Sequence, residues 1–329
     1  MKKTLIFSIL LIAGFWFIPL ASLALTISPA KIMLDGNPGD VLETKMTIRN
    51  DLDRILIFYP SFQRFTTRGE EPIFLADQTD LASWITTDPV QVTLNYNQQA
   101  NIKITVRIPQ DAEPGGHYAA IFWSSAAPGG EGGSGVSIVT KVGALVLLDV
   151  SGDTVESAQL ERFGAEKTLF SHKPVSFTYT LENVGTVHLE PVGQIVIKNI
   201  FGRTAAVLAI NPAGTNILPG TERTVSAANF EPEGGMPKIE GDSFWSELKR
   251  EKEGFALGYY RANLNLEYGK KEIQTLKAGF GFWVFPWRII MVSLLGLGIL
   301  LLLLTKGVQK YNQWIIGRVR ASLLQEKKK

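Results

Sequence analysis

Apolar and polar residues alternate with a period of two along most of this chain. Residues 42–48, 102–108, 177–181 and 260–266 carry apolar side chains at every second position, with Thr44 as the one exception. Such alternation is typical of β-strands that bury one face. Clusters of glycine, proline and asparagine separate these runs, as expected for turns between strands. The pattern therefore predicts an all-β body.

Two uninterrupted apolar runs depart from this pattern, one near each end of the chain. Residues 4–20 contain no charge, follow Lys2 and Lys3, and are succeeded by Ser22-Leu23-Ala24. A basic start, an apolar stretch and a small-x-small sequence are typical of a cleaved signal peptide. We therefore predict a signal peptide at residues 1–24. The alternative is an uncleaved N-terminal anchor, because the 17 apolar residues approach the length that spans a bilayer.

The second apolar run, residues 289–305, lies between Arg288 and Lys306 and contains five consecutive leucines. At about 1.5 Å per residue it extends roughly 25 Å, close to the thickness of a bilayer's hydrocarbon core. We predict a transmembrane α-helix at residues 288–306. A helix buried in a protein core is the alternative, but the leucine run has no polar face. Five aromatic residues of the kind found at membrane interfaces lie just before or at its start: Phe280, Phe282, Trp283, Phe285 and Trp287.

Charge is distributed unevenly around this predicted span. Residues 25–287 contain 23 basic and 30 acidic residues, whereas residues 288–329 contain eight basic residues and one acidic residue. By the positive-inside rule, this predicts a single-pass protein of the cell membrane with an extracytoplasmic body and a basic cytoplasmic tail, residues 307–329. The tail fits either a helix on the inner membrane surface or a solvated segment. An acidic body argues against a nucleic-acid partner.

A weak internal repeat divides the body into two similar halves. Thr-Ile-Arg-Asn at 47–50 matches Thr-Leu-Glu-Asn at 180–183, and residues 116–120 match residues 258–262 in the same order. A strand, a turn, a second strand, a connector and a late strand entered by a tyrosine are the sequence order of an immunoglobulin-like sandwich. The repeat therefore predicts two tandem immunoglobulin-like sandwiches.

The predicted domains span residues 25–150 and 152–281. In each, a tyrosine holds the position of a tyrosine corner, and these are Tyr118 and Tyr260. Short helical stretches are predicted only at residues 76–84 and 243–252.

Three predicted strands of the first domain, residues 55–62, 118–123 and 142–150, are apolar on both faces. If Tyr118 faces the core, then Ile121 and Trp123 point away from it, beside Leu145 and Leu147 of the next strand. A sheet that is apolar on both faces needs cover on both. The cover is either the second domain, the 76–84 segment, or an external partner, in which case these four residues form a partner-binding face. The glycine-rich segment 125–135 lies at the tip of the same hairpin, where binding loops commonly occur.

Little in the sequence supports catalysis or a bound cofactor. There is no cysteine, so disulfides, thiolate catalysis and cysteine-ligated metals are excluded. The three histidines, His117, His172 and His188, show no metal-ligand spacing. The glycines at 129–135 lie between strands and not before a helix, unlike a phosphate-binding loop. We therefore expect a non-enzymatic protein with no catalytic, cofactor or metal site.

The order of these segments resembles a known family. It comprises the turn Gly36-Asn37-Pro38-Gly39, a strand ending in Asn50, Ile108-Pro109, and Glu-Pro-Gly-Gly-His-Tyr-Ala-Ala-Ile at 113–121. With a second sandwich, one span and a basic tail, it is similar to the WxL-interacting proteins of Gram-positive bacteria. The resemblance implies a peptidoglycan-binding first domain and a host-binding second domain, and it assigns no individual ligand residue. The same segments are shared with pilus-chaperone-like sandwiches.

Two functions follow as hypotheses. The first is a membrane-anchored cell-surface binding or adhesion module that holds cell-wall polymer or a surface protein. The alternative is an extracytoplasmic assembly subunit or chaperone that acts by pairing a sheet edge with exported partners.

Overall fold

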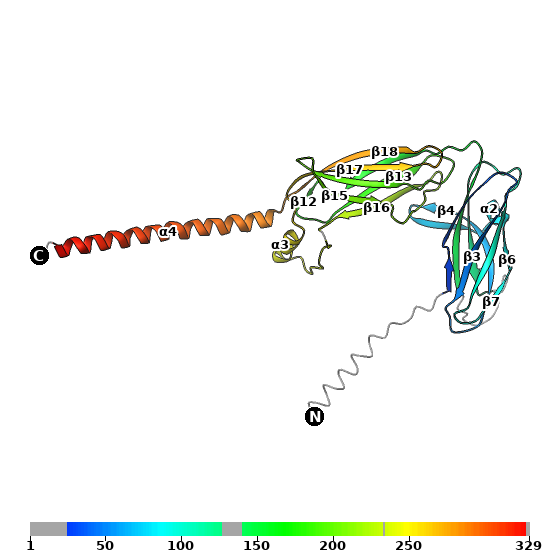
Figure 1. Cartoon of the computed structure of the whole chain (residues 1–329), viewed down its shortest axis with the longest axis horizontal. Helices are drawn as coiled ribbons and strands as arrows, with labels where there is room; N and C mark the ends of the chain where they lie inside the picture. Colours follow the sequence, from blue (N-terminus) through cyan, green and yellow to red (C-terminus); the bar gives the residue numbers. More distant parts are fainter. Residues whose placement is uncertain (1–24, 127–139, 233, 327–329) are drawn as a thin grey trace, which may run out of the picture. The chain divides into compact units, whose positions relative to one another are not determined.

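The computed structural model describes residues 25–126, 140–232 and 234–326 and shows two β-sandwiches and a long C-terminal helix (Figure 1). The chain divides into two compact units. The first runs to Ser157 and also takes in Asn183–His188 and Leu218–Thr221; the second contains the rest. The predicted boundary near Gly152 lies before this division. The two later segments that fold with the first unit were not foreseen from the sequence.

The first unit packs two antiparallel-rich sheets face to face. One sheet has the order β1 (Leu25–Ser28), β3 (Val41–Asn50), β8 (Gln99–Arg107) and β6 (Ile85–Asp88). The other has the order β2 (Lys31–Gly36), β10 (Lys141–Val150), β9 (Gly115–Ser124), β4 (Leu56–Arg68) and β5 (Glu71–Leu75), and β7 (Val92–Leu94) also pairs with β4. The chain crosses from one sheet to the other at Pro29, which has no N–H to donate to a ladder.

The core of the first unit lies between these sheets, and the alternating strands supply it. Met46, Ile48, Ile102 and Ile104 are almost fully buried, as period-two alternation predicts. The helix α2 (Leu81–Trp84) closes one side of this core with Leu81. It is shorter than the predicted 76–84 stretch.

The second unit repeats the sandwich with different strand lengths. One sheet has the order β11 (Ala158–Ala165), β13 (Val175–Asn183) and β16 (Glu222–Phe230). The other has the order β12 (Leu169–Phe170), β18 (Gln274–Val284), β17 (Gly258–Tyr268), β14 (Val192–Asn199) and β15 (Thr204–Ile210). Its core contains Phe177, Tyr179, Leu264 and Phe282, none of them exposed. The predicted all-β fold of two immunoglobulin-like sandwiches is confirmed.

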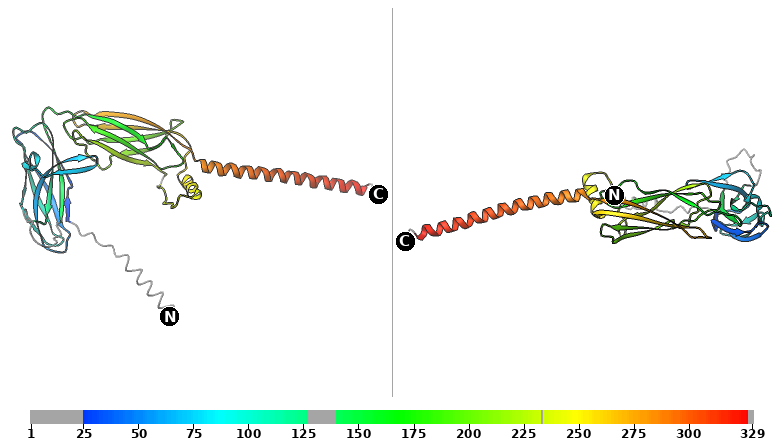
Figure 2. Two further views of the ribbon diagram at one scale, coloured as in Figure 1. Left: turned by 180° about the vertical axis from the view of Figure 1, so that it is seen from behind. Right: turned by 90° about the horizontal axis from the view of Figure 1, so that it is seen from above.

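Two further helices belong to the second unit. The predicted 243–252 stretch is the helix α3 (Phe244–Glu253), and α4 (Trp287–Glu326) is one continuous helix (Figure 2). Residues 287–316 of α4 are long and apolar enough to cross a membrane, and none of the most apolar window is buried. The predicted span and most of the predicted tail thus form a single helix. The predicted signal peptide, the glycines at 129–135 and Lys327–Lys329 lie outside the described residues.

Candidate functional site

The strand β9 decides which face of the first unit is available to a partner. Ile121 and Trp123 are both 0% exposed and belong to the core between the two sheets. The prediction that they point away from the core is therefore wrong. Side chains alternate along a strand, so Tyr118, Ala120 and Phe122 must occupy the opposite, outer face. The predicted pattern was shifted by one residue, which exchanges the two faces.

Leu145 and Leu147 of β10 do lie on the outer face. They pair across the ladder with Ala120 and Tyr118, so they are not beside Ile121 and Trp123 as predicted. Leu147 packs in a small cluster with Phe65 and with Leu218, one of the later residues that fold with the first unit. His188, from the other such segment, places its ring 5.9 Å from that of Tyr118. Part of the apolar outer face is thus covered from within the chain.

The two predicted tyrosine corners are not equivalent. Tyr118 lies on the outer face, whereas Tyr260 stacks on Phe282 against the core of the second unit. The buried Tyr118 hydroxyl lies near the His188 backbone but makes no well-formed hydrogen bond among the described residues. Burial, with the nearby Asp149 carboxylate, raises the pKa of Tyr118 above its ordinary value. The Tyr260 hydroxyl likewise has no hydrogen bond to another described residue, so neither tyrosine makes the predicted corner bond.

A tyrosine that does bind backbone in the second unit is Tyr268, which the sequence did not single out. Its hydroxyl accepts a hydrogen bond from the Ala158 N–H at 3.2 Å and donates one to Gln274 Oε1 at 2.8 Å. Tyr268 is the last residue of β17 and continues its alternating apolar pattern, and this pattern is the sequence feature that could have identified it as buried.

The first half of β10 lacks a paired strand on one of its two sides. The strand β2 pairs in parallel with β10 from Leu145 to Val150, and the ladder begins with the Leu145 N–H donating to the Ala30 carbonyl at 2.9 Å. On its other side β10 pairs with β9 along its whole length. Residues 141–144 therefore pair with one strand, β9, among the described residues, although β1 also lies close to β10.

Hydrogen-bond directions show which groups face this open edge. The Thr140 carbonyl accepts from the Ser125 N–H at 3.0 Å on the β9 side, while the Leu145 N–H points to the β2 side. Because backbone groups of successive residues point to opposite sides of a strand, Lys141 and Gly143 direct their N–H and C=O groups outward. An extended chain placed there would find a row of unpaired donors and acceptors.

The outer face beside this edge is aromatic. Phe122 pairs with Gly143 across the ladder and lies edge-on to Phe74 at 4.9 Å. A Cβ at Gly143 would stand 2.5 Å from the Phe122 ring, which explains the glycine here. The Lys141 ammonium lies 4.1 Å from the centre of the same ring. Phe74 is 39% exposed, so this part of the face keeps apolar area for a partner.

His117 lies in β9 between two hydrogen-bond acceptors. Its Nδ1 is 2.5 Å from Asp80 Oδ1, and its Nε2 is 2.8 Å from the Glu113 carbonyl oxygen. Both partners are acceptors, and both ring nitrogens donate at once only in the protonated imidazole, so this arrangement favours the charged form. Burial alone would lower the pKa of His117, but the contacts with Asp80 and Glu113 outweigh it and raise the pKa above its ordinary value. In the described part of the chain, no three acidic or histidine side chains gather as metal ligands would.

The second unit carries a groove of mixed polar and apolar character on its larger sheet. Its volume is about 480 Å³, and successive outward residues of β17 line it, together with Lys198 and the turn that follows it. These β17 residues are Tyr259, Arg261, Asn263 and Asn265. They offer hydrogen-bond donors and acceptors to a polar ligand.

Comparison with known proteins finds similar structures but no related sequence. No protein-family model matches the sequence, and neither does any curated protein sequence. Among solved structures, the chain is similar to several chaperones. They include the class 5 fimbriae chaperone CfaA (14% identity, TM-score 0.39, covering 78% of this chain and 98% of that one). They also include the E. coli chaperone DraB (11%, 0.33, 78% and 96%) and Pseudomonas aeruginosa CupB2 (7%, 0.35, 78% and 100%). These identities and TM-scores are too low to carry an argument about function.

Proposed function

We propose that this protein is a membrane-anchored, extracytoplasmic binding protein that holds an extended segment of another exported or surface protein at the open edge of β10. The observation that carries the proposal is the stretch 141–144, which has no paired strand on the side opposite β9. There Lys141 and Gly143 direct their backbone N–H and C=O groups outward. Strand addition at a sheet edge supplies main-chain hydrogen bonds, and neighbouring side chains supply specificity. The exposed aromatic face formed by Phe74 and Phe122 gives that specificity an apolar character.

The last strand of the second unit serves as an internal comparison. β18 pairs with β12 only at Trp283 and Val284, so it also has an edge that is largely unpaired among the described residues. Both edges carry an outward lysine and glycine, Lys277 with Gly279 on β18 and Lys141 with Gly143 on β10, so these residues do not distinguish them. The β10 edge differs because the Phe122 and Phe74 rings lie beside its unpaired groups. We therefore assign the partner to β10 and not to β18.

The anchor and its orientation complete the proposal. α4 is the membrane span, the acidic body is outside, and the basic end of α4 is inside, as the positive-inside rule requires. The family resemblance stays a prediction. Binding of wall polymer also stays a prediction. We would seek that binding in the groove on the larger sheet of the second unit, which Asn263 helps to line.

Proline substitutions at the two edges test the proposal. Lys141→Pro removes an outward N–H without breaking the β9 ladder, because the Lys141 N–H faces away from β9. The tagged full-length chain is extracted from its own cells in mild detergent, and the surface proteins recovered with it are measured. We expect Lys141→Pro to lower recovery about tenfold, as expected for one lost hydrogen bond of about 1.4 kcal/mol.

Two matched controls isolate the edge. Lys141→Ala keeps the N–H and loses only the contact with the Phe122 ring, and Lys277→Pro places the same proline on the β18 edge. Both are expected to recover partners as the unchanged chain does. Equal recovery by Lys141→Pro would refute edge pairing at β10.

A further inference from the structure

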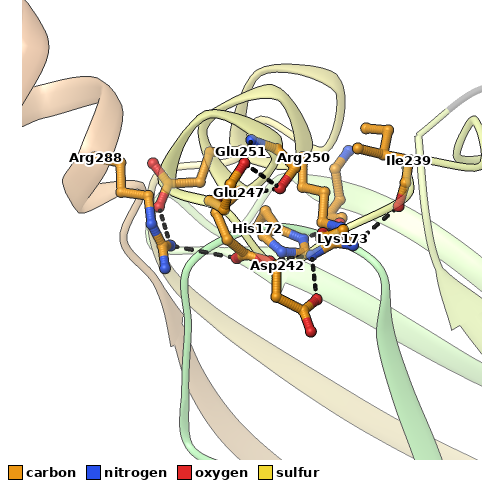
Figure 3. A network of polar contacts seen from close by, with 11 residues as sticks. His172, Lys173, Ile239, Asp242, Glu247, Arg250, Glu251 and Arg288 are labelled. Atoms are coloured by element: carbon orange, nitrogen blue, oxygen red, sulfur yellow. Dashed lines mark hydrogen bonds and ion pairs between the residues drawn. The ribbon is translucent and has the colours of Figure 1, made fainter.

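The helix α3 has two faces with different chemistry. Glu247, Arg250 and Glu251 lie at helical spacing on one face, which turns toward the sandwich and the start of α4 (Figure 3). Trp245, Leu248, Lys249 and Lys252 occupy a second face at positions i, i+3, i+4 and i+7.

The first face fastens α3 to the start of α4. Glu251 is fully buried, and its carboxylate binds Arg288 Nη1 at 3.0 Å and accepts the Ile289 N–H at 3.0 Å (Figure 3). Glu247 lies 3.4 Å from the same guanidinium. A buried carboxylate that pairs with an arginine and also caps a helix N-terminus holds two elements in one geometry. The position of α3 beside α4 is therefore set by the protein and not by the membrane.

The second face borders a groove of about 360 Å³ between the two helices. α3 lines it with Trp245, Leu248, Lys249 and Lys252, and α4 lines it with Ile289, Val292 and Ser293. The lining holds two lysines and no acidic residue. Neither lysine forms an ion pair with another described residue. Trp245 is 71% exposed although it is a large aromatic side chain.

The groove lies at the level where the apolar part of α4 begins. Ile289 and Val292 belong to the first two turns of the span, about 3–8 Å along the helix from Trp287. Trp283, Phe285 and Trp287 are all exposed at this end of the chain's body, as aromatic residues at a membrane interface are. With α4 across a bilayer, the apolar floor of the groove is continuous with the hydrocarbon and its lysines stand at headgroup height.

We propose that this groove binds an anionic phospholipid of the outer leaflet. An acyl chain lies against Leu248, Ile289 and Val292, and the phosphate lies between Lys249 and Lys252. The charge of the lining is complementary to an anionic headgroup, and lipid is the molecule that the span brings to this depth. The inference rests on α4 crossing the membrane and is independent of the β10 edge.

The experiment uses the full-length chain in nanodiscs of phosphatidylcholine that contain a minor fraction of phosphatidylglycerol. Native mass spectrometry measures how much phosphatidylglycerol remains bound after release from the disc. We expect the unchanged chain to retain it selectively and the double variant Lys249→Gln/Lys252→Gln to retain about tenfold less or lower still. The matched control Lys45→Gln/Lys277→Gln removes the same charge away from the groove and should retain phosphatidylglycerol normally.

A second variant separates the groove from simple charge attraction. Val292→Trp fills the apolar floor and leaves both lysines in place, so it should also lose the retained lipid. Equal loss in the control, or no loss in Val292→Trp, would overturn the proposal. Alkaline carbonate extraction of membranes tests the premise separately, because release of the chain would show that α4 does not span.

Discussion

The two sandwiches share a turn device but present different edges. In the first unit the buried Asn50 donates to the Arg54 carbonyl and accepts from the Leu52 N–H. At the end of β13, where the chain enters the segment Asn183–His188 that folds with the first unit, the buried Asn183 donates to the Val187 carbonyl and accepts from the Gly185 N–H. The spacing is the same in both, so the repeat found in the sequence corresponds to one structural solution used twice.

The difference lies in what surrounds the last strand of each unit. Both edges carry a lysine, but the leading half of β10 is unpaired on one side and has the Phe122 and Phe74 rings beside it. Similar architecture thus leaves one edge with an aromatic face next to its unpaired backbone groups. Fold alone does not assign function, and the site must be argued from these local differences.

The largest expected effect comes from replacing one large buried side chain with alanine in each unit separately. Trp123→Ala should cost about 3–5 kcal/mol and unfold the first unit, and Phe282→Ala should do the same to the second. Hydrogen-exchange mass spectrometry on the detergent-solubilised chain reports which unit loses protection. Trp283→Ala, the exposed neighbour of Phe282, is the control and should change little. Unchanged protection of the first unit in Trp123→Ala would mean that this indole does not support the core.

A smaller effect is expected at the shared turns. Asn50→Ala and Asn183→Ala each leave buried backbone groups without a partner, and each should cost about 1–3 kcal/mol, felt in the sandwich whose strand it ends, β3 or β13. Urea unfolding followed by hydrogen exchange measures the loss unit by unit. The exposed Asn101→Ala provides the comparison and should be close to neutral. An effect in only one of the two units would show that the repeated turn is not energetically equivalent.

The smallest expected effect is a pH dependence confined to the first unit. The pKa of His117 is raised in the folded chain, so its contribution to stability is complete below its unfolded pKa of about 6.5 and is lost as the pH rises through the folded value. Urea midpoints of the first unit should therefore fall over this rise in pH. Asp80→Asn and His117→Gln should flatten the dependence.

Asp77→Asn is the control for this titration. Its carboxylate binds Arg64 at 3.1 Å, so the pH dependence should persist in this variant. A flat profile in the unchanged chain would contradict a charged His117.

The sequence alone determined the elements that depend on local periodicity. Strict alternation marked β3, β8, β13 and β17, an unbroken apolar run marked the start of α4, and the short amphipathic stretch marked α3. The repeated Thr-x-x-Asn segments marked the paired turns, although not that both asparagines are buried. These predictions agree with the structure because each concerns a strand face, a helix or a turn that residues close in sequence define by themselves.

Only the tertiary structure decided which face of an apolar strand is inside. β9 and β10 are apolar on both sides, so a shift of one residue left the sequence pattern unchanged while exchanging Trp123 with Phe122. Three other features depend on segments that are distant in sequence. Leu218 and His188 cover the outer face of β9 and β10, β2 begins to pair with β10 only at Leu145, and α3 and α4 form a groove. Period-two alternation shows which face of a strand is apolar and which is polar. Where both faces are apolar, only packing against segments distant in sequence determines which face is buried in the core.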